Sequence, residues 1–160
     1  MAKNVKESNV VSRWGVLVEG VAGKESRFFQ LVQDSLKKRG WPYAVQQVDV
    51  GGGFFGAGKP YLETKSGKME AYVGAESIGR DSYLGWSLMI ADPGMFSKAI
   101  AAAGNFSSAI FQQMSFNEAN SARAFATSLN YAVQEAVDVL LDEAGLDKSK
   151  IDRKVSGLLI

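Results

Sequence analysis

Residues 83–90, YLGWSLMI, form the most apolar strand that this 160-residue chain predicts. Every second side chain is large and apolar, and smaller residues stand between them, which fits the two-residue period of a β-strand. The large set is Leu84, Trp86, Leu88 and Ile90, and the opposite set contains Gly85 and Ser87. A strand with this alternation buries one of its faces, so we expect it in a sheet that is covered on one side.

Further strands are predicted upstream of residues 83–90. A Ser66-Gly67 turn joins two short runs of alternating residues, which is the signal of a β-hairpin. Before the hairpin, a helix that ends at Gly40 separates two more strands, and this order predicts a right-handed crossover between parallel neighbours. The predicted strands cover residues 10–19, 43–50, 61–65, 68–75 and 83–90, and the helix covers residues 24–39.

The C-terminal half of the chain is predicted to be helical. Asp92-Pro93 is a favourable helix start, and Ser115 and Glu118 have the spacing of a capping box at the start of a long helix. That helix is expected to cover residues 118–144 and to end at Gly145. The apolar tail, residues 155–160, is expected to dock on the rest of the domain.

The order of the elements predicts a single α+β domain over residues 1–160. We expect one mixed sheet of about five strands, in the order β-α-β-β-β-β, followed by C-terminal helices that pack on one face. Residues 1–9 are polar and are expected to be frayed. The length suffices for a sizeable core, since a chain of this size buries roughly 70% of its unfolded surface.

The composition excludes several kinds of site. The chain has no histidine and no cysteine, which removes the commonest general base, the thiol nucleophile and the usual zinc ligands. We therefore expect no metal and no cofactor. The net charge is +1, so we do not expect nucleic-acid binding. The chain has no long apolar run, so we do not expect a membrane span. The absence of cysteine fits a reducing compartment, so we expect a cytoplasmic protein.

A glycine-rich loop follows the strand predicted at residues 43–50. Residues 53–59 spell G-x-x-x-x-G-K, which resembles the phosphate loop of P-loop nucleotidases, where backbone N–H groups and the lysine surround phosphate. The chain departs from that family because Pro60 stands where a metal-binding Ser or Thr is needed. The next segment also predicts a strand, whereas a phosphate loop opens a helix. We therefore do not expect nucleotide hydrolysis.

The same loop is nevertheless the predicted ligand site. The turn at residues 20–24 also follows a strand, and a parallel crossover would bring both loops to the end of the sheet where ligands bind such units. Aromatic side chains would supply apolar contact, lysines charge, and glycines room for an anionic small molecule such as a nucleotide. The candidate ligand-binding residues are Lys24, Gly53, Phe54, Phe55, Gly58 and Lys59.

The carboxylates of the predicted hairpin need no catalytic role. Glu63 and Glu70 are predicted to lie across the hairpin, near Lys65 and Lys68. An exposed sheet face with alternating charges explains this pattern.

The stretch between Asp92 and Glu118 carries a single charge, Lys98. A helix that faces water usually carries charges on its outer side, so this stretch predicts either an intramolecular helical hairpin or a subunit interface. The second interpretation makes the protein a homo-oligomer. Its candidate interface residues are Phe96, Ile100, Ala103, Phe106 and Ile110.

Three functional hypotheses follow. The first is a non-catalytic binding protein that self-associates and takes an anionic small molecule at its glycine-rich loops. The second is an enzyme that uses lysine and carboxylate groups, with Lys24, Lys59, Glu76, Asp81 and Asp92 as candidates. The third is an adaptor whose C-terminal helices and tail dock a partner protein. We expect binding in preference to catalysis, because the carboxylates do not cluster in the sequence.

Overall fold

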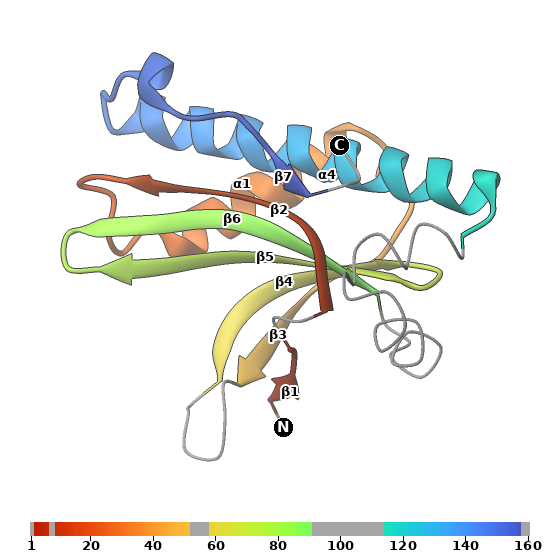
Figure 1. The fold of residues 1–160 in the computed structure, drawn as a ribbon. Coiled ribbons are helices and arrows are strands. Elements are labelled where there is room, and N and C mark those ends of the chain that lie inside the picture. Colours follow the sequence, from red (N-terminus) through yellow and green to blue (C-terminus); the bar gives the residue numbers. More distant parts are fainter. Residues whose placement is uncertain (1, 7–8, 52–57, 91–113, 158–160) are drawn as a thin grey trace.

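The computed structural model describes residues 2–6, 9–51, 58–90 and 114–157. In these ranges one mixed sheet, ordered β1-β3-β4-β5-β6-β2-β7, carries the helices α1 and α4 on one face (Figure 1). The strands are β1 (Lys3–Asn4), β2 (Val10–Val18), β3 (Val45–Gly51), β4 (Lys59–Ser66), β5 (Met69–Ile78), β6 (Asp81–Ile90) and β7 (Ser156–Gly157). The helices are α1 (Glu25–Lys38), α4 (Phe116–Glu143) and the 3-10 helix η2 (Lys148–Lys150). The predicted α+β class is confirmed, with the short strands β1 and β7 added to the expected sheet.

The predicted crossover between parallel neighbours was wrong. Strands β2 and β3 do run in the same direction, because antiparallel pairings link β3 to β4, β5, β6 and finally β2. Three strands therefore separate β2 from β3 in the sheet. The physical reason is that β3 to β6 form a meander through short connections, and β6 then returns to pair with β2, with Trp14 opposite Trp86. Helix α1 thus crosses the width of the sheet instead of linking neighbouring strands.

The hydrophobic core lies between the sheet and the two long helices. The alternation predicted for residues 83–90 is confirmed, since its large side chains are all buried on the helix-covered face. Burying side chains of this size contributes about 1.5–3 kcal/mol each. The core includes Leu84, Trp86, Leu88 and Ile90 from β6, Phe28, Val32 and Leu36 from α1, and Phe125, Leu129, Val133 and Val137 from α4.

The ends of the helices follow the local sequence signals. The capping box predicted at the start of α4 is confirmed: the Ser115 side chain accepts from the Glu118 N–H, and the Glu118 carboxylate accepts from the Ser115 N–H. Gly40 and Gly145, which follow α1 and α4, have φ values of 69° and 68°. These glycines stop the helices in a left-handed conformation that other residues adopt at a cost.

A buried hydrogen bond fastens α4 to the middle of the sheet. The indole Nε1 of Trp86 donates to Asn130 Oδ1 at 3.0 Å, and both side chains are buried. The same Asn130 oxygen accepts from Gln134 Nε2 at 3.1 Å. Asn130 is therefore the polar group that allows a tryptophan N–H to sit in the core, because an unpaired buried donor is costly.

Both chain ends add short strands to the edges of the sheet. Lys3 and Asn4 pair in parallel with Val50 and Gly51, so part of the segment that was expected to be frayed is ordered. The backbone pairing with β3 is the reason. At the other edge, β7 pairs with β2, which confirms that the start of the C-terminal tail docks on the domain. Residues 158–160 lie outside the described ranges.

Some predictions cannot be compared with the described part of the chain. The helix start at Asp92-Pro93 and the candidate interface residues Phe96, Ile100, Ala103, Phe106 and Ile110 lie outside it. Within the part that is described, α4 and the other helices are too short or too polar to cross a membrane.

Replacing Asn130 tests the hydrogen bond between α4 and the sheet. Asn130→Ala leaves the Trp86 N–H without its acceptor, so the free energy of unfolding should fall by about 1–3 kcal/mol. Asn120→Ala is the matched control, because Asn120 is exposed on the same helix, and it should change stability by less than about 0.5 kcal/mol. Urea denaturation followed by circular dichroism measures both. Equal losses in the two variants would contradict the role assigned to Asn130.

Candidate functional site

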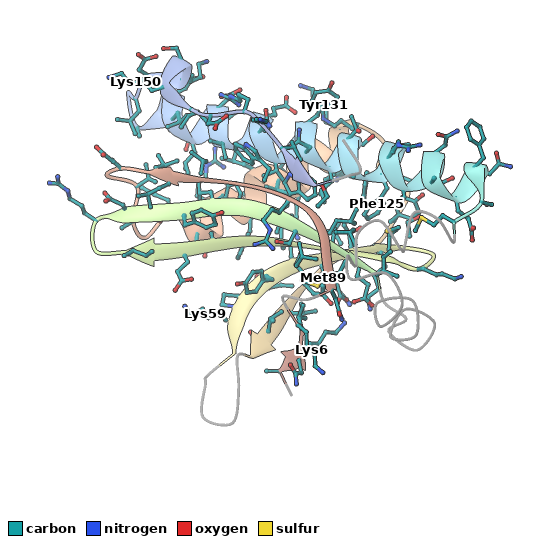
Figure 2. The ribbon with its side chains drawn as sticks, viewed as in Figure 1. Lys6, Lys59, Met89, Phe125, Tyr131 and Lys150 are labelled. Carbon is teal, nitrogen blue, oxygen red and sulfur yellow. The ribbon has the colours of Figure 1, made fainter. Side chains whose placement is uncertain are left out.

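The face of the sheet opposite α1 and α4 carries a pocket. Within the described ranges the long helices cover just one side of the sheet, and Figure 2 shows Met89 and Lys59 on the other side. We call this side the open face. Its pocket has a volume of about 280 Å³. Side chains that line it include Val5, Arg13, Tyr61, Tyr72, Glu76, Tyr83, Ser87 and Met89.

A row of glycines crosses three adjacent strands beneath the pocket. Gly15 of β2 lies opposite Gly85 of β6, and Gly85 lies opposite Gly74 of β5. Both Gly74 and Gly85 line the pocket. Because consecutive residues in a strand alternate between faces, a side chain at any of these positions would project from the open face. The glycine row therefore creates a depression in an otherwise pleated surface.

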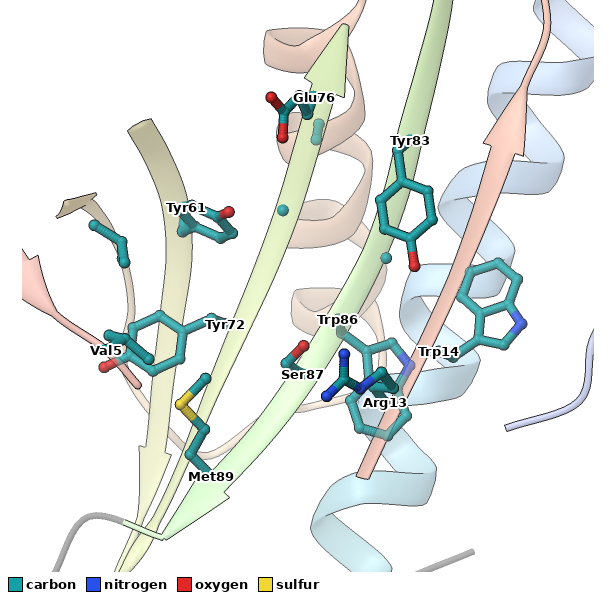
Figure 3. A pocket seen from close by; sticks show the side chains of 14 residues that line it. Val5, Arg13, Trp14, Tyr61, Tyr72, Glu76, Tyr83, Trp86, Ser87 and Met89 are labelled. Atoms are coloured by element: carbon teal, nitrogen blue, oxygen red, sulfur yellow. The ribbon is translucent and has the colours of Figure 1, made fainter. Parts of the chain in front are cut away.

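Two tyrosine rings lie across the outer glycines of this row. A Cβ atom at Gly74 would lie 2.5 Å from Cε1 of Tyr61, and a Cβ atom at Gly15 would overlap the hydroxyl of Tyr83. Figure 3 shows Tyr61 and Tyr83 on opposite sides of the pocket, on β4 and β6. The glycines thus give two aromatic side chains room to lie along the sheet and to form the walls of the depression.

The middle glycine, Gly85, is required for a different reason. A Cβ atom at Gly85 would overlap the carbonyl oxygen of Trp14 and lie 2.7 Å from Cα of Gly15. These neighbours are backbone atoms of the paired strand β2, which cannot rotate away as a side chain can. The close approach of β2 and β6 therefore requires glycine at position 85.

Polar groups surround the aromatic walls. Arg13 and Ser87 lie opposite each other on β2 and β6, and both line the pocket. Glu76 lines the pocket near the end of β5 and forms an ion pair with Lys59 at the start of β4. This carboxylate raises the pKa of Lys59 by hydrogen bonding, so the lysine stays charged. The pocket combines an aromatic interior with charges of both signs at its edge.

A buried carboxylate lies beside the pocket. Glu63 on β4 is 1% exposed, and it forms an ion pair with Lys3 and accepts from Gln46 Nε2 at 2.9 Å. The hydroxyl of Tyr72, a pocket residue, lies 2.9 Å from Glu63 Oε2 and 2.8 Å from Glu70 Oε2, so its single hydrogen faces two carboxylates. The expectation of an exposed charged face was wrong for Glu63, because β1 and Tyr72 bring their polar groups over it.

The ionisation of this network is set by its contacts. Burial alone would raise the pKa of Glu63, but hydrogen bonds from Lys3, Gln46 and Tyr72 outweigh it and lower that pKa. Burial and the two neighbouring carboxylates raise the pKa of Tyr72 well above its usual value. Around neutral pH, Glu63 is therefore ionised and Tyr72 is protonated. Neither group is suited to exchange protons with a substrate there, since a general acid or base works best with a pKa near the working pH.

The residues predicted for ligand binding are only partly brought together. Lys59 begins β4 and faces the open side, and Gly58 precedes it. Lys59 therefore starts a strand, as the departure from the phosphate-loop pattern required. Lys24 is the N-cap residue of α1, which follows β2 in the chain. Three strands of the sheet, β4, β5 and β6, separate β2 from β3. Gly53, Phe54 and Phe55 lie outside the described residues.

The turn before α1 directs its backbone groups into the protein. The N–H groups of Gly20 and Gly23 donate to Asp81 Oδ1 at 3.1 Å and to Ser77 Oγ at 3.0 Å. The N–H of Ala22 donates to the Arg80 carbonyl at 3.1 Å. These hydrogen bonds hold the turn against the β5–β6 connection, which gives the glycine turn and Asp81 a structural role.

A second cavity, of about 420 Å³, lies between the β4–β5 turn and the first turns of α4. Met69, Met114 and Phe125 supply much of its apolar lining. Met114 is the first residue described after residue 90. The open-face pocket is lined by residues of five described strands or their neighbours and combines aromatic and charged side chains, so we take it as the candidate site. In the described part of the chain, acidic residues nowhere gather in threes or more to hold a metal ion.

Comparisons of the chain with models of known protein families, with curated proteins and with solved structures found no match. The case for a function therefore rests on the geometry of the open face. The residues that matter most there, Gly74, Gly85, Tyr61 and Tyr83, were not among the sequence candidates. Their shared signal is a glycine inside each of three strands, and only the pairing register reveals that these glycines form one row.

Substitution of the glycines tests the two reasons for the row. Gly85→Ala places a methyl group against backbone and should lower the free energy of unfolding by about 2 kcal/mol or more. Gly15→Ala needs only a rotation of the Tyr83 ring and should cost clearly less. Thermal and urea denaturation of both variants measure the difference. A Gly85→Ala variant as stable as the Gly15→Ala variant would contradict the close approach of β2 and β6.

Acid titration tests the buried carboxylate. The pKa of Glu63 is lowered in the folded state, against about 4.3 in an unfolded chain. Its contribution to stability is therefore present above about pH 4 and is lost as the pH falls through the lowered value. Glu63→Gln should be less stable than the parent at pH 7 and should lose less stability on acidification. Glu19→Gln, at an exposed position, should follow the parent, and a Glu63→Gln profile parallel to the parent's would refute this assignment.

Proposed function

We propose that this chain is a non-catalytic binding protein whose open-face pocket takes a small planar molecule with a largely apolar surface. The observation that carries the proposal is the glycine row, over which Tyr61 and Tyr83 form facing walls. The pocket volume of about 280 Å³ is close to the lower end of the range for small-molecule sites, which begins at roughly 300 Å³. A small ligand fits this volume better than a peptide or a nucleic acid.

The preference for a planar ligand follows from the shape of the pocket. Gly74 and Gly85 line the pocket, and the rings of Tyr61 and Tyr83 lie along the sheet beside them, so the pocket offers flat aromatic surface to a planar ring. Tyrosine rings favour offset or edge-on contacts with other aromatic rings, which contribute roughly 0.5–1.5 kcal/mol beyond burial. Met89 adds a polarizable sulfur to the lining, and methionine adapts well to aromatic ligands.

The charges at the edge favour a ligand with an anionic substituent. Arg13 presents a planar guanidinium, which binds carboxylate, sulfonate or phosphate groups through paired hydrogen bonds. Lys59 starts β4, which β5 and β6 separate from the strand of Arg13, and it forms an ion pair with Glu76. This moves the anionic ligand that the sequence predicted from the glycine-rich loop to the open face, with Lys59 at the border of both.

Binding is favoured over catalysis by the state of the groups at the site. Glu63 and Tyr72 are held in their neutral-pH forms by mutual hydrogen bonds. Lys59 and Glu76 satisfy each other, and Asp81 accepts from the Gly20 backbone. Three of the enzyme candidates, Lys59, Glu76 and Asp81, are thus engaged in structural contacts, whereas a catalytic pair would converge on one reacting atom.

Self-association and the docking of a partner protein are further predictions of the sequence. Self-association through Phe96, Ile100, Ala103, Phe106 and Ile110 concerns residues outside the described ranges. The adaptor hypothesis depends on the tail, of which the structure describes only the first residues, and β7 there is already paired with β2. The cytoplasmic location also stays a prediction.

Titration with anilinonaphthalene sulfonate, a fluorescent aromatic anion, tests the pocket. The parent should bind the probe at a saturable site. Tyr61→Ala and Tyr83→Ala should each weaken binding by about fivefold, which corresponds to roughly 1 kcal/mol for a lost aromatic contact. Ser87→Trp, which fills the pocket, should abolish saturable binding.

Tyr131→Ala is the matched control, because Tyr131 is an exposed tyrosine on α4. It should leave the probe affinity unchanged. Equal affinity in the parent and all four variants would mean that the probe reports general apolar surface, and the proposed function would be rejected. Native mass spectrometry of the purified parent provides an independent search for a co-purified molecule of the expected class.

A further inference from the structure

The N-terminal segment Ala2–Val5 has little backbone pairing of its own. Its strand β1 is two residues long and pairs only with the last residues of β3, Lys3 with Val50 and Asn4 with Gly51. Pairing this short has little stability in isolation. Short segments with so few backbone hydrogen bonds open locally at low free energy, without unfolding the domain. Side-chain contacts must therefore decide whether the segment stays docked.

Three side chains fasten the segment, and each contacts a different feature. Ala2 packs where glycines leave room, since Cβ atoms at Gly51 and Gly58 would lie 3.1 and 3.0 Å from the Ala2 Cβ. Lys3 forms an ion pair with the buried Glu63. Val5 lines the open-face pocket. The four residues of the segment thus reach from the end of β3 and the start of β4 to the ligand pocket.

Glu63 connects the segment to the pocket wall. Its Oε2 atom accepts both from Lys3 Nζ and from the hydroxyl of Tyr72, which lines the pocket. When the segment is docked, the same carboxylate oxygen therefore holds Lys3 and orients Tyr72. Val5 and Tyr72 both line the pocket. Docking of the segment and the shape of the pocket are physically linked.

We propose that residues Ala2–Val5 form a detachable wall of the open-face pocket, so that docking of the segment and occupancy of the pocket reinforce each other. The proposal rests on the proposed function, because it assigns a regulation to that same site. A ligand that contacts Val5 binds the docked state more tightly than the undocked one, and by linkage it stabilises docking by the same factor.

Detachment is feasible because Glu63 keeps other partners. Gln46 Nε2 and the Tyr72 hydroxyl each lie 2.9 Å from a Glu63 oxygen, and Lys65 Nζ lies 3.7 Å away. Loss of Lys3 therefore does not leave the buried carboxylate without hydrogen bonds or a counter-charge. An isolated buried charge would be costly enough to lock the segment in place. This arrangement permits a two-state segment on a stable sheet.

The test combines probe affinity with amide hydrogen exchange in the full chain. In the parent, saturating anilinonaphthalene sulfonate should slow exchange at Asn4 and Val5. Lys3→Met should speed exchange at these amides without the probe and weaken probe affinity by about fivefold, the lower end of usual coupling between sites. Val5→Ala should also weaken binding of the probe and reduce the effect of the probe on amide exchange. Lys6 is an exposed lysine next to this segment, and Lys6→Met should match the parent in both measurements.

The outcomes separate this proposal from the proposed function. If the parent binds the probe, Tyr61→Ala weakens it, and Lys3→Met and Val5→Ala bind like the parent with unchanged exchange, the pocket is real and the detachable wall is refuted. If Tyr61→Ala and Ser87→Trp leave probe binding intact, the proposed function itself fails. If Lys3→Met and Lys6→Met have the same effects, the contribution of Lys3 is general charge and the proposal is overturned.

Discussion

In the described part of the chain, the two long helices cover one face of the sheet, and no described helix lies on the other face. The core is dense on the covered side, where β6 supplies Leu84, Trp86, Leu88 and Ile90. The same strand must then present a different set of residues to the open side, because its side chains alternate. The open-face set of β6 is Tyr83, Gly85, Ser87 and Met89, and all four line the pocket. One strand therefore provides both the centre of the core and the floor of the candidate site.

Two structural features characterise the open face. The first pairs charges across neighbouring strands, as Lys59 does with Glu76 and Lys65 with Glu70. Exposed pairs of this kind add little stability, but they keep a broad surface polar. The second is the lack of side chains at Gly15, Gly74 and Gly85, with the Tyr83 ring across Gly15 and the Tyr61 ring across Gly74. Where these two features meet, the surface is both hollow and aromatic, and the open-face pocket lies there.

The sequence predicts those features that depend on neighbours along the chain. Alternation identified the buried face of residues 83–90, and the spacing of Ser115 and Glu118 identified the start of α4. These signals are local, because a strand period and a helix cap each span a few residues. The α+β class followed from the order of such elements. It needed no knowledge of which strands pair.

The features that the sequence did not predict depend on pairing between distant strands. Periodicity assigns Gly15, Gly74 and Gly85 to one face each, but only register places them in one row. Glu63 looks like a surface carboxylate until Lys3, sixty positions away in the chain, is brought over it by a strand of two residues. The expected site at the glycine-rich loop rested on β2 and β3 being neighbours, and the return of β6 to β2 separates them. The order and register of the strands therefore determine where the candidate site lies, while local sequence patterns predict the individual strands and helices.

The chemistry of the open face also limits how such a site can respond to its surroundings. The chain has no histidine, so the side chain that most often changes charge near neutral pH is missing. Contacts lower the pKa of Glu63 and raise that of Tyr72, which moves both further from neutrality. Small changes of pH around neutrality thus leave this network as it is. The regulation that we propose depends instead on movement of β1, whose Lys3 shares the Glu63 carboxylate with Tyr72.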